Sequence, residues 1–111
     1  MDIGIDLIEF ARISKLPTNT SSRVLSSSEL KQYEAFTNER RKLEYLAGRI
    51  SLKEAYIKAF NYKELIYNEL SFINNSDGKI EVFHKYKLLD NLKVSLSHSE
   101  NYCIAIVLKL F

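Results

Sequence analysis

Two carboxylates stand where apolar residues are expected. Glu54 lies in the segment RISLKEAYIKAF (49–60), which has the spacing of an amphipathic helix. On a helical projection it shares a stripe with four apolar side chains: Leu43, Ala47, Ile50 and Ile57. Asp6 interrupts an alternating apolar segment, although Asp is disfavoured in strands. Together the two acids suggest a Mg²⁺ site, because this ion binds through one or two carboxylates, waters and substrate phosphates.

Each carboxylate also has a purely structural explanation, and the sequence leaves both open. Glu54 is spaced for an i,i+4 ion pair with Lys58, worth about 0.2–0.5 kcal/mol on an exposed helix face. Asp6 could face water on an edge strand. Near a metal, Lys53 and Lys58 would suit a phosphorylated ligand. His98, at the predicted end of a strand, is by itself most simply an exposed histidine in a turn.

The apolar pattern predicts the elements that would position these side chains. Residues 2–8 (DIGIDLI) alternate and are β-branched, which predicts a strand with Asp6 opposite its isoleucines. The sequence SSSE at 26–29 has the form of a capping box and opens a helix to about Phe36. A long helix follows over residues 39–60.

Shorter elements complete the chain. We expect a short helix at 9–16 ended by proline, a loop at 17–22, a hairpin of 67–73 with 79–86, a short helix or a connection at 87–92, and two strands at 93–99 and 102–110. This order predicts one α+β domain over residues 1–111, with a long central helix packed on a mainly antiparallel sheet.

Composition excludes several classes of protein. A net charge of +2 is too balanced for non-specific nucleic-acid binding. The lone thiol of Cys103 excludes an internal disulfide and fits a reducing compartment. No run approaches the roughly 18 apolar residues of a membrane span. The first residues form no signal peptide, so we expect a cytoplasmic protein with no membrane partner.

Three motifs in order resemble the holo-acyl-carrier-protein synthases, the short 4′-phosphopantetheinyl transferases. They are GIDLIEFARI (4–13), EYLAGRISLKEAYIKAF (44–60) and VSLSHSENYCIAIV (94–107). The second motif has the core pattern of the family, with Lys53-Glu54-Ala55 followed by Lys58-Ala59. The resemblance implies the 4′-phosphopantetheinyl transferase fold. It also implies transfer of 4′-phosphopantetheine from coenzyme A to a serine of apo acyl carrier protein, for fatty acid biosynthesis, with 3′,5′-ADP as the other product.

The resemblance also implies roles for individual residues. Asp6 and Glu54 would bind Mg²⁺, and Lys58 would face the diphosphate. The other residues implied in coenzyme A binding are Arg49, Lys53, Asn61 and His98, where Asn61 stands in the place of a Gly-rich turn. Carrier-protein docking would use Arg12, Lys15 and Arg23. Whether a metal-bound water or a site carboxylate accepts the proton of the serine stays open.

The family works as a homotrimer with active sites between subunits. We therefore expect a trimer, with the strand YCIAIVLKL as the first candidate for burial between subunits. A rival hypothesis is a non-catalytic module that docks an acidic protein through Arg12, Arg23 and residues 40–42. A small RNA-binding domain that stacks bases on its 13 Tyr and Phe residues is the third and weakest hypothesis.

Overall fold

The computed structural model describes residues 2–111. Its elements are β1 (Asp2–Glu9), α1 (Phe10–Ser14), α2 (Thr20–Val24), α3 (Ser27–Ala35), α4 (Glu39–Phe60), the 3₁₀ helix η1 (Tyr67–Glu69), β2 (Leu70–Asn74), β3 (Ile80–His84), β4 (Lys87–Leu88), β5 (Leu92–His98) and β6 (Tyr102–Lys109). The predicted α+β class is confirmed, although the strands form two sheets.

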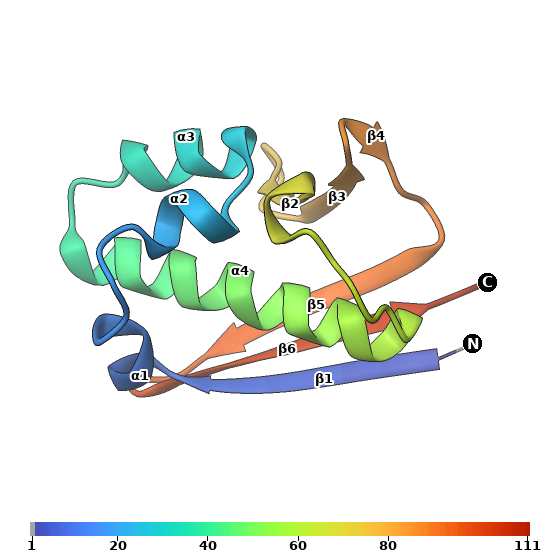
Figure 1. Ribbon diagram of the computed structural model, residues 1–111, viewed down its shortest axis with the longest axis horizontal. Helices are drawn as coiled ribbons and strands as arrows, with labels where there is room; N and C mark the ends of the chain where they lie inside the picture. Colours follow the sequence, from blue (N-terminus) through green and yellow to red (C-terminus); the bar gives the residue numbers. More distant parts are fainter. Residues whose placement is uncertain (1) are drawn as a thin grey trace.

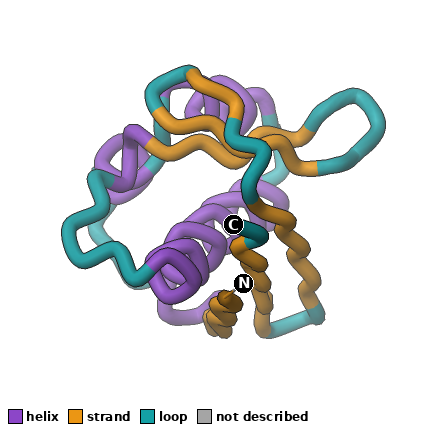
Figure 2. The backbone as a smooth tube through the Cα atoms, turned by 90° about the vertical axis from the view of Figure 1, so that its right-hand side faces the viewer, coloured by secondary structure: helices purple, strands orange, loops and turns teal. Residues whose placement is uncertain are grey.

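Helix α4 runs through the middle of the molecule (Figure 1). One antiparallel sheet, in the order β1-β6-β5, lies along one side of it. The smaller antiparallel sheet β2-β3-β4 and helices α2 and α3 lie on the other side, as the turned view in Figure 2 also shows. The strands of the larger sheet extend along α4, so residues of β1 meet several turns of the helix.

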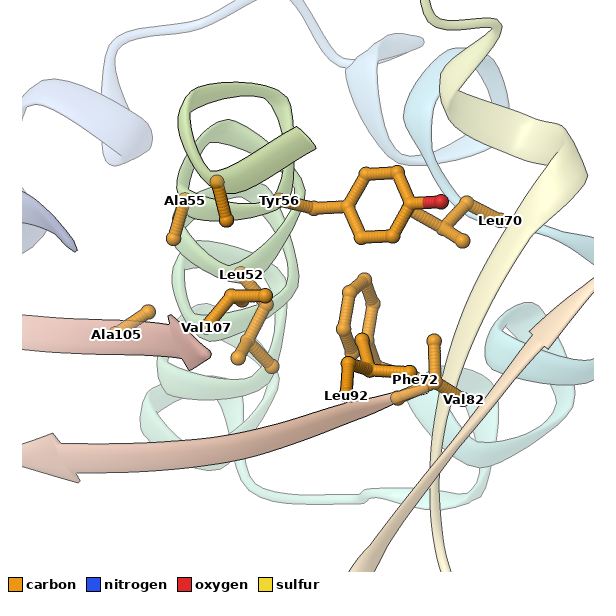
Figure 3. Close-up of a cluster of buried hydrophobic side chains, with 10 residues drawn as sticks. Leu52, Ala55, Tyr56, Leu70, Phe72, Val82, Leu92, Ala105 and Val107 are labelled. Atoms are coloured by element: carbon orange, nitrogen blue, oxygen red, sulfur yellow. The ribbon is translucent and has the colours of Figure 1, made fainter. Parts of the chain in front are cut away.

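The main core lies between α4 and the two sheets (Figure 3). Its fully buried helix residues are Leu52, Ala55 and Ala59, which face β6 and the small sheet. The stripe with Glu54 that the sequence suggested is therefore not the centre of the buried face. On that stripe Ala47 is buried, but Ile50 and Ile57 are only half-buried.

Strand β1 packs directly against the backbone of α4 at Gly4. A Cβ atom at this position would overlap the carbonyl oxygen of Ala55 and the backbone nitrogen of Ala59. The absence of a side chain thus brings the strand onto the helix. Asp6 is two residues further along β1 and points to the same side, since side chains alternate along a strand.

The ends of α3 and α4 follow the local sequence as predicted. The capping box at Ser26 is present, with reciprocal hydrogen bonds between Ser26 and Glu29. Helix α4 starts after Asn38, whose Oδ1 accepts from the backbone N–H of Arg41 at 3.1 Å. It ends at Asn61 in the left-handed conformation, at φ 51° and ψ 44°, which Asn tolerates better than most residues.

Several local predictions were wrong, among them the strand predicted at residues 67–69, which form the 3₁₀ helix η1. Residues 20–22, predicted as part of a loop, belong to helix α2, so Arg23 lies on a short helix and not on a loop. Of the two alternatives for residues 87–92, the short helix is wrong: the segment contains the two-residue strand β4, which pairs with β3, then a connection, and Leu92 begins β5. No helix among residues 2–111 has the length and apolar character needed to cross a membrane.

Candidate functional site

Asp6 and Glu54 line the same cleft. This cleft has a volume of about 280 Å³ and lies where β1, α1 and α4 meet. Its remaining lining residues are Leu7, Ile8, Arg12, Ile13, Leu16 and Ile50. The structure thus brings together the two acids that the sequence singled out, and adds Arg12 at the same opening.

The carboxylate of Asp6 is only half satisfied. Its Oδ1 lies 3.4 Å from Lys58 Nζ, which also donates to the carbonyl oxygen of Ile5 at 2.9 Å. Its Oδ2 is buried and, within residues 2–111, accepts no hydrogen bond. Burial raises the pKa of Asp6 and the charge of Glu54 adds to this, while Lys58 opposes both effects. An unpaired buried carboxylate oxygen is costly, and a bound cation would satisfy it.

Glu54 is held by a residue that sequence reasoning missed. The hydroxyl of Tyr67, on η1, donates to Glu54 Oε1 at 2.6 Å. Burial and this hydrogen bond raise the pKa of Tyr67, so the hydroxyl keeps its proton. Lys58 pairs with Asp6 and not with Glu54, which removes the i,i+4 explanation for Glu54. Nothing in the sequence places Tyr67 opposite Glu54, because 13 residues and the end of a helix separate them.

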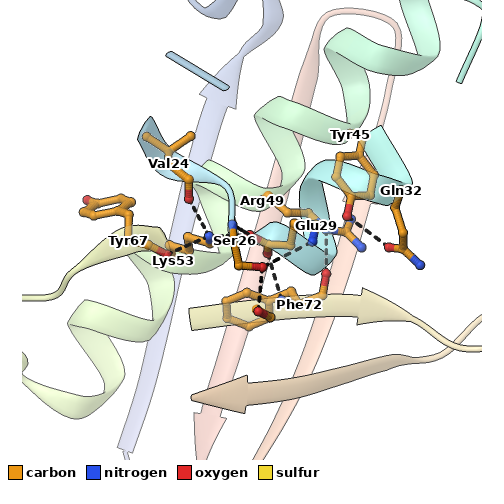
Figure 4. A network of polar contacts seen from close by, with 10 residues as sticks. Val24, Ser26, Glu29, Gln32, Tyr45, Arg49, Lys53, Tyr67 and Phe72 are labelled. Carbon is orange, nitrogen blue, oxygen red and sulfur yellow. Dashed lines mark hydrogen bonds and ion pairs between the residues drawn. The ribbon is translucent and has the colours of Figure 1, made fainter. Parts of the chain in front are cut away.

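Lys53 lies outside the cleft, in a buried polar network (Figure 4). Its side chain is fully buried, and its Nζ donates to Val24 O at 2.6 Å, Glu29 Oε1 at 2.6 Å and Tyr67 O at 2.9 Å. An ammonium has three donors, and all three are used here. The assignment of Lys53 to coenzyme A binding therefore conflicts with its position, and its role is to tie α2, α3 and η1 to α4.

Arg49 and His98 meet in a second cleft of about 250 Å³, which shares no lining residue with the first. Arg49 is 3 % exposed; its Nε donates to Phe72 O at 2.9 Å and its Nη2 to Asn74 Oδ1 at 2.8 Å. His98 is exposed, with Nδ1 4.0 Å from Glu44 Oε2. Most of the guanidinium of Arg49 therefore supports the cleft wall, whereas His98 is free to meet a ligand.

The remaining predicted site residues lie on the surface. Arg12 is in the last turn of α1 and Lys15 caps that helix. Arg23 is exposed on α2, and Asn61 is exposed where α4 ends. Of these four, Arg12 alone lines the cleft that contains Asp6 and Glu54.

The cleft fits a Mg²⁺ ion that shares its ligands with a substrate. Within residues 2–111, no three His, Cys, Asp or Glu side chains gather into a ready metal site. Two carboxylates, one with an unsatisfied oxygen, suit Mg²⁺, which keeps several waters and takes further ligands from phosphates. Waters or the phosphate oxygens of a ligand would supply the remaining positions around such an ion.

Comparison with known proteins gives consistent matches. The model of the 4′-phosphopantetheinyl transferase superfamily matches residues 2–107. A holo-[acyl-carrier-protein] synthase of Staphylococcus saprophyticus is 37 % identical over 96 % of this chain and 94 % of its own. The solved holo-(acyl-carrier-protein) synthase of Bacillus anthracis, in complex with CoA (3′,5′-ADP), has a TM-score of 0.81 and 32 % identity, and covers 96 % of this chain and 92 % of its own. That of Helicobacter pylori, in complex with coenzyme A, has a TM-score of 0.77 and 25 % identity, over 96 % and 98 %.

Proposed function

The chain belongs to the 4′-phosphopantetheinyl transferase superfamily, and on that premise we propose how its residues carry out the reaction of a holo-acyl-carrier-protein synthase. The protein transfers 4′-phosphopantetheine from coenzyme A to a serine of apo acyl carrier protein, and adenosine 3′,5′-bisphosphate leaves. The observation that carries our assignment of the site is the unsatisfied Oδ2 of Asp6 in the cleft that it shares with Glu54.

Asp6 and Glu54 would hold Mg²⁺ together with the diphosphate of coenzyme A. When bound, the metal would supply positive charge to the diphosphate oxygens, and charge stabilisation is the main demand of phosphoryl transfer. The cation would also offset the burial of the Asp6 carboxylate and its repulsion by Glu54, both of which raise the pKa of Asp6.

Lys58 is placed to add a second positive charge. Its Nζ uses one donor on Ile5 O and one on Asp6 Oδ1, which fixes the ammonium beside the cleft. The third donor remains for a phosphate oxygen, since an ammonium carries three. Just over half of the Lys58 side chain is exposed, so a ligand can reach it.

The adenosine end of coenzyme A would occupy the cleft of Arg49 and His98. The two clefts have no lining residue in common, so they are separate clefts in one subunit. We propose that the site forms between subunits of a homotrimer, where the carboxylate cleft of one subunit faces the His98 cleft of its neighbour.

The outer face of the β1-β6-β5 sheet supports such an assembly. Three residues of β1 on this face are apolar and exposed, Ile3 at 65 %, Ile5 at 51 % and Leu7 at 60 %, and Ile106 of β6 lies opposite Ile5 at 37 %. An exposed apolar sheet face of this kind marks a protein interface. We therefore place the subunit contact on β1 as well as on β6, which was the first candidate from the sequence.

The acyl carrier protein would approach over α1. Arg12 opens onto the carboxylate cleft, and Lys15 and Arg23 are exposed on the adjoining short helices. Positive charge beside the cleft suits an acidic partner, because complementary charge speeds encounter and fixes register. We further propose that the protein acts in the cytoplasm and supplies holo carrier protein for fatty acid biosynthesis.

The transfer itself is tested by mass spectrometry of an apo carrier protein after incubation with the chain, coenzyme A and Mg²⁺. We expect the carrier to gain one phosphopantetheine group. Glu54→Gln should abolish the gain, and Glu64→Gln, which changes an exposed glutamate beyond the helix, should not. Binding of the carrier without any mass gain would instead support a docking module.

A further inference from the structure

Tyr67 contacts Glu54 from outside β1, α1 and α4, the three elements that form the carboxylate cleft. It lies on η1, which follows α4 through a loop and packs against α2. Its hydroxyl donates to Glu54 Oε1 at 2.6 Å. A hydrogen bond to an ionised group at this distance is stronger than one between neutral groups.

The same helix holds Tyr67 at both ends. Lys53 donates to the backbone carbonyl of Tyr67 at 2.9 Å, and the next residue, Glu54, accepts from its hydroxyl. Lys53 in turn forms a fully buried ion pair with Glu29 at 2.6 Å, so its ammonium has no freedom to move (Figure 4). The backbone of Tyr67 is thus fixed relative to α4, and its rigid ring holds the hydroxyl in place beside the carboxylate of Glu54.

The two acids of the cleft are arranged alike. Each has one oxygen bound to a protein donor: Oδ1 of Asp6 to Lys58, and Oε1 of Glu54 to Tyr67. Oδ2 of Asp6 has no partner, and within residues 2–111 no hydrogen bond reaches Oε2 of Glu54. A free Glu side chain samples many rotamers, and restricting it to one of them on metal binding costs conformational entropy. A fixed hydrogen-bond partner reduces that cost because the side chain is already ordered before the metal binds.

We propose that Tyr67 is a positioning residue that fixes the carboxylate of Glu54, so that Oε2 faces a divalent cation in the cleft. This inference rests on the proposed metal site. Groups that orient a metal ligand through its other atom typically change metal affinity by about 10- to 100-fold when removed. A purely structural hydrogen bond would instead change the stability of the folded chain and leave metal affinity alone.

The test is a titration with Mn²⁺ as a spectroscopic probe, followed by electron paramagnetic resonance, with coenzyme A present. Tyr67→Phe removes the hydroxyl and keeps the ring. We expect it to bind Mn²⁺ about 10-fold or more weakly than the wild type and to need correspondingly more Mg²⁺ for half-maximal transfer, with kcat largely recovered at saturating Mg²⁺. Tyr62→Phe, the same change at an exposed tyrosine beyond α4, should bind like the wild type.

A double-mutant cycle with Glu54 tests the same hydrogen bond from its other partner. Glu54→Asp retracts the carboxylate from the hydroxyl. Compared with Glu54→Asp alone, the double variant Glu54→Asp/Tyr67→Phe should bind Mn²⁺ less than about 3-fold more weakly. The reason is that Tyr67 acts on the metal only through Glu54. If the double variant bound Mn²⁺ about 10-fold more weakly than Glu54→Asp alone, the proposal would be overturned.

Equal Mn²⁺ affinity of the wild type and Tyr67→Phe, with only a lower melting temperature for the variant, would also overturn the role of Tyr67 and leave the proposed metal site intact. A wild-type chain that binds no Mn²⁺ would overturn both the metal site and the role of Tyr67. The mass gain of the carrier protein would then still decide separately whether the chain is a transferase.

Discussion

Replacing Lys53 by methionine should destabilise the fold without acting on coenzyme A. Methionine fills a similar volume but removes the ammonium that pairs with Glu29 at 2.6 Å, in a place where both side chains are fully buried. It also leaves the carbonyl oxygens of Val24 and Tyr67 without this donor. Breaking a buried ion pair from one side typically costs about 3–5 kcal/mol.

The loss should lie near the lower end of that range. Glu29 keeps two backbone donors, the N–H of Ser26 at 2.9 Å and the N–H of Phe72 at 2.8 Å, so its carboxylate is still hydrogen-bonded in the variant. A loss of about 3 kcal/mol corresponds to a fall in melting temperature of about 10–20 °C for a domain of this size. The double variant Glu29→Gln/Lys53→Met removes both charges and should recover part of the loss.

Urea unfolding followed by circular dichroism measures this change, at one protein concentration because assembly adds to apparent stability. Lys63→Met, which changes an exposed lysine beyond α4, is the matched control and should stay within about 0.5 kcal/mol of the wild type. A stable Lys53→Met protein with a raised KM for coenzyme A would refute our account, and would restore the role that the sequence alone suggested.

Three further predictions concern Asp6 in the cleft, Ile5 on the outer sheet face and Arg12 on α1. Asp6→Asn should abolish transfer, and without metal the free energy of unfolding at pH 7 should be unchanged or higher. The pKa of Asp6 is raised in the folded state, so the ionised carboxylate destabilises the fold at neutral pH. The stability of the wild type should therefore grow as the pH falls. A clear loss of melting temperature without metal would contradict this. Ile5→Glu places a charge on the outer sheet face, and light scattering should then give the monomer mass of 12.9 kDa with loss of transfer. Leu88→Glu, on the small sheet, is the control, and a trimer in Ile5→Glu would move the interface elsewhere. Arg12→Glu should raise KM for the carrier protein strongly, change KM for coenzyme A little and flatten the salt dependence of kcat/KM, because surface charges mainly steer encounter and salt screens them. Equal losses for both substrates, measured by steady-state titration, would argue against docking at Arg12.

The parts of the fold that depend on local chemistry could be predicted from the sequence. The start of α3 follows from the Ser26–Glu29 capping box, and α4 lies between two asparagines that cap it, Asn38 and Asn61. The register of the last hairpin follows from a short turn between two apolar runs. Each of these signals lies within a few residues of the feature that it determines.

Features that depend on tertiary packing could not be predicted in this way. Lys53 and Glu54 are neighbours in a motif, and the sequence does not say that one turns into a buried network and the other toward a cleft. The projection of α4 suggested a single apolar stripe, but the helix is covered on two sides and its buried face is broader. The hydroxyl of Tyr67 reaches Glu54 only through the path of the loop after α4, which carries no local signal.

The metal site of Asp6 and Glu54 can be located in crystals grown with coenzyme A and Mn²⁺, through the anomalous scattering of the metal. We predict an anomalous peak between Oδ2 of Asp6 and Oε2 of Glu54, within coordinating distance of each oxygen and next to the diphosphate. A bound coenzyme A whose diphosphate lies elsewhere, or a metal peak that touches neither carboxylate, would contradict it.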